Sequence, residues 1–153
     1  MSLEEMSQTR RRAWLAAVIW SVVGVGFLVS VFSGGGPGEL AQDSMRHLAG
    51  AGALAFGFVG YWLALWLTRQ RKGGPPAADE RDAQVLARAN QATLVVVLVG
   101  IFALTIGLWM AFESEGSVPV GWMWFLAYGS AILASVTSPV VTLILDGRTG
   151  GHE

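Results

Sequence analysis

The sequence predicts an all-α integral membrane protein, a bundle of four transmembrane helices with both termini in the cytoplasm. Of its 153 residues, 53% are hydrophobic and 14% are charged, and the mean hydropathy is +0.51. A soluble domain carries more charge. Four apolar stretches, each long enough to cross a bilayer, occupy about residues 13–33, 48–67, 94–112 and 120–145. With their short connections they use up residues 1–153, so we expect a single membrane domain.

The first apolar stretch, residues 13–33, follows three arginines, Arg10 to Arg12, and contains no charged residue. As a helix it reaches roughly 31 Å, which is enough for the hydrocarbon core of a bilayer. A cleaved signal peptide also begins with basic residues, but its apolar region is usually only about 7–15 residues long. We therefore expect a retained membrane anchor.

A glycine-rich turn follows, and Pro37 within it is suited to start a new helix. On such a helix Glu39, Asp43 and His47 would share one face at four-residue intervals. This face could hold a divalent metal through two carboxylates and an imidazole. The alternative, which we favour, is a solvated face whose charges pair locally with Arg46 and His47.

Small side chains recur in the second and third apolar stretches. In the second they repeat at four-residue intervals at Ala49, Ala53 and Gly57. Small residues let helix backbones approach closely in lipid. The pattern fits tight packing inside the bundle and fits a homo-oligomer equally well. The third stretch carries a similar line of small residues at Gly100, Ala103, Gly107 and Ala111.

The central segment, residues 77–93, is the longest charged, helix-like stretch of the chain. Asp79 is placed to cap a helix whose first turn carries Glu80 and Asp82, where unpaired backbone N–H groups and the helix dipole favour negative charge. Beyond the cap, apolar and polar residues fall on different sides of the helix, which makes the segment amphipathic. The apolar side is Val85, Leu86, Ala89 and Ala92, and the polar side is Arg81, Gln84, Arg88 and Gln91.

No Gly or Pro separates this segment from the third apolar stretch, so we expect one continuous helix that begins in water and ends across the membrane. In the fourth stretch Pro139 removes a backbone donor and is expected to bend the helix, with Ser135 and Ser138 supplying replacement hydrogen bonds. A bend that lines a substrate path is the functional alternative.

The basic residues predict the orientation. With the amino terminus inside, nine of the ten Lys and Arg residues are cytoplasmic and only Arg46 is outside. The nine are Arg10, Arg11, Arg12, Arg69, Arg71, Lys72, Arg81, Arg88 and Arg148. Both termini and the central segment are therefore predicted to be cytoplasmic.

The composition argues against several classes of function. The chain has no cysteine, which excludes disulfides, thiolate chemistry and cysteine-ligated metals, and its net charge of −1 gives no reason to expect nucleic-acid binding. The four apolar stretches contain no acidic, basic or histidine residue, which argues against a proton-coupled exporter. The hydroxyl groups of the fourth stretch have no neighbouring His or Lys to activate them, so we interpret them as interhelical hydrogen-bonding groups. These residues are Ser135, Thr137, Ser138 and Thr142. We expect no enzymatic activity, no catalytic residue and no bound cofactor or metal.

The sequence ADERDAQVLARANQAT, between the second and third apolar stretches, resembles the DER(D/E) segment of small uncharacterised multipass proteins of bacteria and archaea that are grouped as a domain of unknown function. The resemblance rests on Asp79, Glu80, Arg81, Arg88 and Ala89 and on the number of predicted helices. It implies a four-helix architecture, a prokaryotic plasma (inner) membrane and an accessory or regulatory role beside another protein. It supplies no catalytic residues.

Two interpretations of function remain. The first is an accessory, scaffold or regulatory protein that contacts a membrane or regulatory partner through its cytoplasmic segment, at Asp79, Glu80, Arg81, Asp82 and Arg88. The alternative is an oligomeric small-molecule transporter or channel, with a path along the small-residue and hydroxyl faces of the second and fourth stretches. For the cytoplasmic segment itself, we favour a purely structural role as a helix cap over a dedicated docking site.

Overall fold

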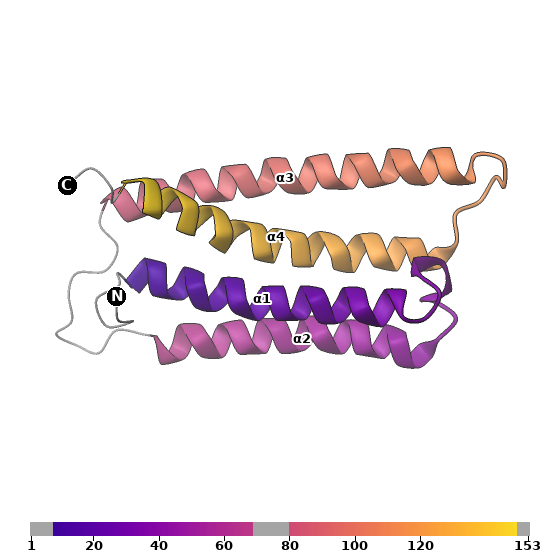
Figure 1. Ribbon diagram of the computed structural model, residues 1–153, viewed down its shortest axis with the longest axis horizontal. Coiled ribbons are helices and arrows are strands. Elements are labelled where there is room, and N and C mark those ends of the chain that lie inside the picture. Colours follow the sequence, from indigo (N-terminus) through magenta and orange to yellow (C-terminus); the bar gives the residue numbers. More distant parts are fainter. Residues whose placement is uncertain (1–7, 69–79, 150–153) are drawn as a thin grey trace.

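The computed structural model describes residues 8–68 and 80–149, and the described chain is all-helical (Figure 1). Four long helices are present, and a short 3-10 helix, η1 (Pro37–Glu39), lies between the first two. The long helices are α1 (Gln8–Phe32), α2 (Ser44–Leu67), α3 (Glu80–Phe112) and α4 (Val120–Thr149). All four are long and apolar enough to cross a membrane, which confirms this part of the prediction and indicates a multipass membrane protein.

The helices extend beyond the apolar stretches that predict them. α3 runs without a break from Glu80 to Phe112, so the amphipathic segment and the third apolar stretch form one helix, as expected. Its predicted cap, Asp79, lies outside the described residues. α4 also continues through Pro139 to Thr149, so the proline does not end the helix. Hydropathy therefore marks the part of each helix suited to lipid, while the polar ends add further turns.

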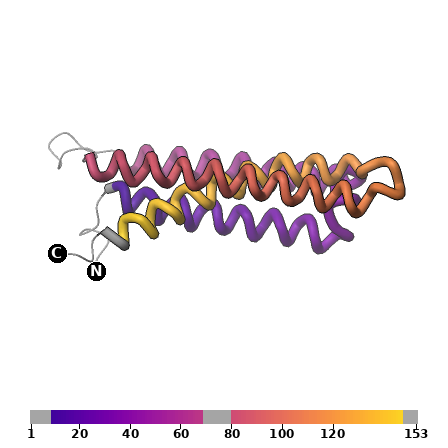
Figure 2. Tube along the Cα trace, turned by 90° about the horizontal axis from the view of Figure 1, so that it is seen from above, coloured from indigo at the N-terminus to yellow at the C-terminus, as the bar shows by residue number. Residues whose placement is uncertain are grey.

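The four helices lie side by side in an open row, in the order α3, α4, α1, α2 (Figure 1). α1 packs against α2 and α4, and α4 packs against α1 and α3. Figure 2 shows that α4 slants relative to α3, so these two helices cross. α1 and α4 are therefore the inner helices, and α2 and α3 are the outer ones.

The core follows one face of α1. Trp20, Val23, Phe27 and Val31 recur at helical spacing on this face, and all are buried. The ring of Phe27 packs against rings of α4, with its centroid 5.8 Å from that of Phe125. α1 thus contributes a continuous apolar stripe around which α2 and α4 are packed.

Small residues of α2 allow the close contact with α1. Gly57 is buried, and a Cβ atom added there would lie only 2.8 Å from the ring of Trp20. Ala53 packs against the same core. At these two positions the small-residue pattern serves packing within the chain. In α3 the pattern differs between two positions. A Cβ added at Gly100 would lie 3.1 Å from the side chain of Leu133, whereas a Cβ added at Gly107 would meet no atom within 4 Å.

The connection from α1 to α2 packs tightly on the start of α4. Gly35 and Gly36 have φ angles of 99° and 101°, which other residues rarely adopt, and they turn the chain from α1 into η1. Leu40 then inserts into the core and is only 1% exposed. Gly121 of α4 lies so close to η1 that an added Cβ would clash with the carbonyl oxygen of Pro37. This contact requires glycine.

Candidate functional site

The first turns of α1 hold together the end of the molecule where α1 and α3 begin and α2 and α4 end, which we call the arginine end. The hydroxyl of Thr9 donates a 2.9 Å hydrogen bond to Oδ2 of Asp82 in the first turn of α3. The Nε atom of Arg10 lies 3.7 Å from Oδ2 of Asp146 near the end of α4. Thr9 and Arg10 of α1 therefore contact α3 and α4, respectively.

Arg12 connects α1 to the remaining helix, α2. Its Nε donates to Oγ1 of Thr68 and its Nη2 donates to the Thr68 carbonyl oxygen, both at 3.3 Å. Thr68 is the C-cap of α2, where backbone carbonyls lack partners and the helix dipole favours a cation. Both contacts are to neutral groups. Within residues 8–68 and 80–149, the ion pairs are Arg10–Asp146 and Arg46–Asp43, so Arg12 belongs to neither.

The structure divides the predicted docking or capping residues into two groups. Asp82 is half-buried and bonded to α1, so it serves the packing of the arginine end. Glu80, Arg81 and Arg88 are exposed, and Asp79 lies outside the described residues. The contact from Thr9 to Asp82 was not predicted from the sequence, because a hydrogen bond between residues 73 positions apart leaves no local pattern.

The amphipathic pattern of α3 is only partly as expected. Val85 and Ala89 are buried, as the helical spacing predicts. Leu86, which was expected on the same side, is 47% exposed. It stands at the edge of a cavity at the arginine end and covers one side of it. The buried side of this segment is therefore narrower than predicted.

This cavity has a volume of about 420 Å³ and is bounded by α1, α2 and α4, with Leu86 contributed by α3. Its lining combines apolar side chains with polar ones. The lining residues are Thr9, Arg12, Ala13, Ala16, Trp20, Phe58, Tyr61, Leu65, Leu86, Ser135, Ser138, Pro139 and Thr142. From the sequence, Ser135, Ser138, Pro139 and Thr142 were expected to act within α4, and Leu86 was expected on the apolar side of the central segment. The arginines were interpreted there as markers of orientation alone.

Hydroxyl groups around Pro139 form the α4 wall of the cavity. The hydroxyl of Thr142, which is 3% exposed, donates a 2.8 Å bond to the Ser138 carbonyl oxygen. The hydroxyl of Ser138 in turn donates to Oδ1 of Asn90 in α3 at 3.4 Å. The hydroxyl of Ser138 thus bonds across to α3, which confirms the interhelical hydrogen bonding expected of this residue. The polar groups near the proline link two helices as well as lining a cavity.

A second cavity of about 460 Å³ lies between α1, α3 and α4, and its lining is almost entirely apolar. Gly24, Gly100 and Gly129 contribute to it, which explains the space left between the helices. Such a cavity suits lipid chains or packing side chains. Its lining includes two serine hydroxyls and no charged group, so it offers a ligand fewer polar contacts than the cavity at the arginine end does.

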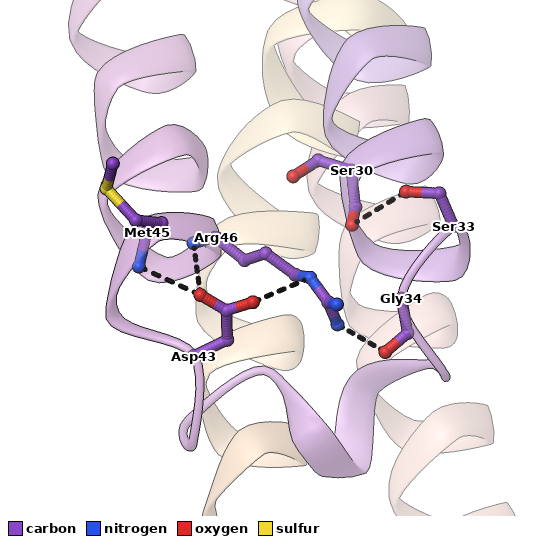
Figure 3. A network of polar contacts seen from close by, with 6 residues as sticks. All are labelled: Ser30, Ser33, Gly34, Asp43, Met45 and Arg46. Carbon is purple, nitrogen blue, oxygen red and sulfur yellow. Dashed lines mark hydrogen bonds and ion pairs between the residues drawn. The ribbon is translucent and has the colours of Figure 1, made fainter.

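At the opposite end of the row, the structure does not form the face on which the metal hypothesis depends. η1 is only three residues long and α2 begins at Ser44, so Glu39 does not share a helix with Asp43 and His47. Asp43 is the N-cap of α2: its Oδ1 accepts from the backbone N–H of Met45 at 3.0 Å and of Arg46 at 3.3 Å (Figure 3). The carboxylate is therefore used as a cap.

The Asp43 carboxylate also pairs with Arg46, as the favoured alternative expected. Oδ2 of Asp43 lies 3.0 Å from Nε of Arg46, and the same guanidinium donates to the carbonyl oxygen of Gly34 just beyond α1 (Figure 3). This network joins the end of α1 to the start of α2. Across the described residues 8–68 and 80–149, no three or more metal-ligating side chains gather in one place.

His47 is placed among aromatic rings instead of in solvent. Its ring centroid lies 4.5 Å from that of Trp124, edge to face, and its Nε2 lies 3.5 Å from the hydroxyl of Tyr128. The buried Nδ1 has no hydrogen-bond partner within the described structure. Packing against α4 therefore decides the position of His47, and sequence spacing gave no sign of it.

In chemical terms the arginine end offers more than the opposite end. It combines a half-buried guanidinium, hydroxyl donors and an apolar cavity in one place. The opposite end combines a helix cap with an aromatic cluster, both of which serve packing. Comparisons of the chain with protein-family models, curated proteins and solved structures found no match.

Proposed function

We propose that this protein is an accessory membrane protein of the prokaryotic plasma membrane, which uses α3 to dock another membrane or regulatory protein. One observation carries the proposal. In the most apolar 18-residue window of α3 no residue is buried, whereas 39% of the corresponding window of α1 is buried. α3 packs against α4 along one side and leaves the rest of its surface for lipid or for a partner.

Two features of α3 suit a protein partner. The small residues Ala103, Gly107 and Ala111 are exposed, and small surface residues let a second helix approach closely in lipid. Arg81 and Arg88 are exposed at the beginning of the same helix, where charges steer encounter and specificity. α3 therefore combines an apolar contact surface with a charged one.

The orientation belongs to the same proposal, with both termini and the start of α3 in the cytoplasm. It is supported by the concentration of nine of the ten basic residues on that side. A chain without cysteine allows a direct test by accessibility labelling in cells. We expect a membrane-impermeant thiol reagent added outside to label Ser114→Cys and to spare Ser7→Cys. The reverse labelling pattern would refute the orientation.

The docking proposal is tested by co-purification from native membranes after crosslinking. We expect a specific partner with the native chain and its loss with Gly107→Leu, because a leucine there would separate the two helices. Gly52→Leu is the matched control, since a Cβ at Gly52 of α2 also meets no atom within 4 Å. Equal recovery of the partner with both variants would rule out α3 as the docking helix.

A second function, an oligomeric small-molecule transporter or channel, is supported by the cavity of about 420 Å³ with its hydroxyl-bearing α4 wall. Pockets of this size accommodate small ligands. Flux assays with the purified protein in liposomes separate the two proposals. Reproducible, saturable uptake that is lost on filling the cavity would reject the accessory role, while absent flux together with a specific partner would reject transport.

A further inference from the structure

The cavity at the arginine end has two chemically different parts. Arg12 and Thr9 lie where α1 begins, and Trp20 lies eight residues deeper along the same helix, roughly 12 Å away at the rise of an α-helix. Between these positions the walls include Phe58 and Leu65. The cavity therefore runs from a cationic, hydroxyl-bearing mouth to an aromatic and aliphatic interior.

The charge of Arg12 has no carboxylate partner among the described residues. The two carboxylates that contact the first turns of α1 bind other residues, since Asp82 accepts from Thr9 and Asp146 pairs with Arg10. The contacts of Arg12 are to the hydroxyl and carbonyl of Thr68, which are neutral. A guanidinium presents several N–H donors in a fixed fork that matches phosphate geometry. The mouth of the cavity is thus suited to an anion.

The arrangement of the helices places this site beside the membrane. α2 contributes Phe58 to one side of the cavity and α3 contributes Leu86 to another, and these are the two outer helices of the row (Figure 1). Arg11, which is exposed, does not line the cavity, whereas the neighbouring Arg12 does. An amphiphile with an anionic head and a hydrocarbon tail matches both parts of the cavity.

We propose that this cavity binds one anionic phospholipid, with its phosphate at Arg12 and one acyl chain along Phe58 and Leu65. The headgroup accepts hydrogen bonds from the Arg12 guanidinium and from the hydroxyl of Tyr61, while the hydroxyl of Thr9 remains bonded to Asp82. The chain covers the ring of Phe58, which is otherwise 55% exposed. This binding site goes beyond the proposed docking function and does not depend on α3 having a partner.

Native mass spectrometry of the full-length protein in detergent tests the proposal, with dioleoyl phosphatidylglycerol and dioleoyl phosphatidylcholine as probes. We expect one phosphatidylglycerol to be retained in preference to phosphatidylcholine. Arg12→Gln should weaken phosphatidylglycerol binding roughly tenfold or more, the effect of losing a charge-assisted hydrogen bond. Arg11→Gln, which removes the same charge one residue away, should leave the affinity within about twofold of the native protein.

Three further variants separate lipid binding from damage to the fold. Arg12→Lys keeps the charge but loses the fork, so it should retain part of the preference for phosphatidylglycerol. Ser135→Leu fills the cavity from α4 and should reduce binding of both lipids, while thermal unfolding in detergent shows whether the chain remains folded. Thr68→Ala removes one hydrogen bond of Arg12 but leaves the guanidinium and its charge in place, so it should preserve lipid binding.

Several outcomes would overturn the proposal. Equal phosphatidylglycerol binding by Arg12→Gln and Arg11→Gln would show that the guanidinium is not the anion site. Unchanged lipid binding by a folded Ser135→Leu variant would show that no chain enters the cavity. Displacement of phosphatidylglycerol by millimolar inorganic phosphate alone would identify a site for free phosphate instead of a lipid. Partner capture through α3 would be unaffected by each of these results.

Discussion

α1 and α3 are both long helices with strongly apolar spans, yet they occupy opposite positions in the fold. In α1, 39% of the most apolar window is buried and one face forms the core, whereas in α3 none of the corresponding window is buried. The reason is their place in the row: α1 lies between α2 and α4, whereas α3 packs mainly against α4 and meets α1 at its first turn (Figure 1). Apolar character therefore predicts that a helix can cross the membrane, but it does not predict which helices it packs against.

Shape distinguishes the two helices better than hydropathy does. Lipid tails are as apolar as leucine, so packing in a membrane depends on close fit and hydrogen bonds. α1 places Trp20 against Gly57, a large ring against the smallest residue. α3 has no such fit at Gly107 within the described chain. The core helix is thus identified by complementary large and small residues on facing helices.

The largest expected effect comes from truncating the central ring of the core. Trp20→Ala removes a buried side chain that packs on α2, and it should lower the free energy of unfolding by about 3 kcal/mol. Trp109→Ala in α3, where the side chain is 62% exposed, is the control and should change it by less than about 0.5 kcal/mol. Unfolding of both variants in mixed micelles measures the difference. Similar losses for the two variants would mean that α3 is as tightly packed as α1.

A second comparison uses two glycines. Gly121→Ala places a Cβ against the carbonyl oxygen of Pro37 and should cost on the order of 1–3 kcal/mol, because backbone atoms must shift. Gly107→Ala in α3 meets no neighbouring atom and should be neutral or stabilise the helix by a few tenths up to about 1 kcal/mol. Thermal unfolding in detergent reads out both effects. A well-tolerated Gly121→Ala would contradict the close contact between η1 and α4.

A smaller effect is expected where the two helices meet. Thr9→Val removes the hydrogen bond from α1 to Asp82 of α3 and should cost about 1 kcal/mol. Thr105→Val is the control, because that hydroxyl bonds only to the Ile101 carbonyl oxygen within its own helix. Hydrogen exchange of the first turns of α3 should increase in Thr9→Val alone. No increase there would show that the bond does not hold the start of α3.

Much of the fold could be predicted from the sequence, because composition and run length are local properties. The apolar stretches located all four long helices, and the absence of Gly or Pro between residues 80 and 99 predicted that α3 is continuous. The order of the helices in the row could not be predicted in this way. It depends on which surfaces fit each other, as Trp20 fits Gly57, and that fit joins residues far apart in the chain.

The candidate site was predicted less well, for a related reason. The arginines before the first apolar stretch were interpreted as topology signals, and the structure shows that Arg10 and Arg12 also tie α1 to α4 and α2. The cavity beside Arg12 is formed by residues of all four helices, so no single stretch contains it. The face of Glu39, Asp43 and His47 failed because Asp43 begins a helix instead of continuing one.

The smallest effect on stability, and the sharpest test of function, concerns Arg81 and Arg88. Both side chains are exposed on α3, and Arg88 lies close to the point where the helix becomes fully apolar. The double variant Arg81→Glu, Arg88→Glu should change the free energy of unfolding by no more than about 1 kcal/mol, since exposed charges contribute little to folding.

If α3 docks a partner, the same variant should fail to capture that partner, because charge reversal acts on encounter and specificity. The matched variant Arg11→Glu, also exposed but on α1, should keep capture at the native level. Undiminished capture by the α3 double variant would remove these arginines from the docking surface, while Asp82 would keep its structural role in this segment through its bond to Thr9.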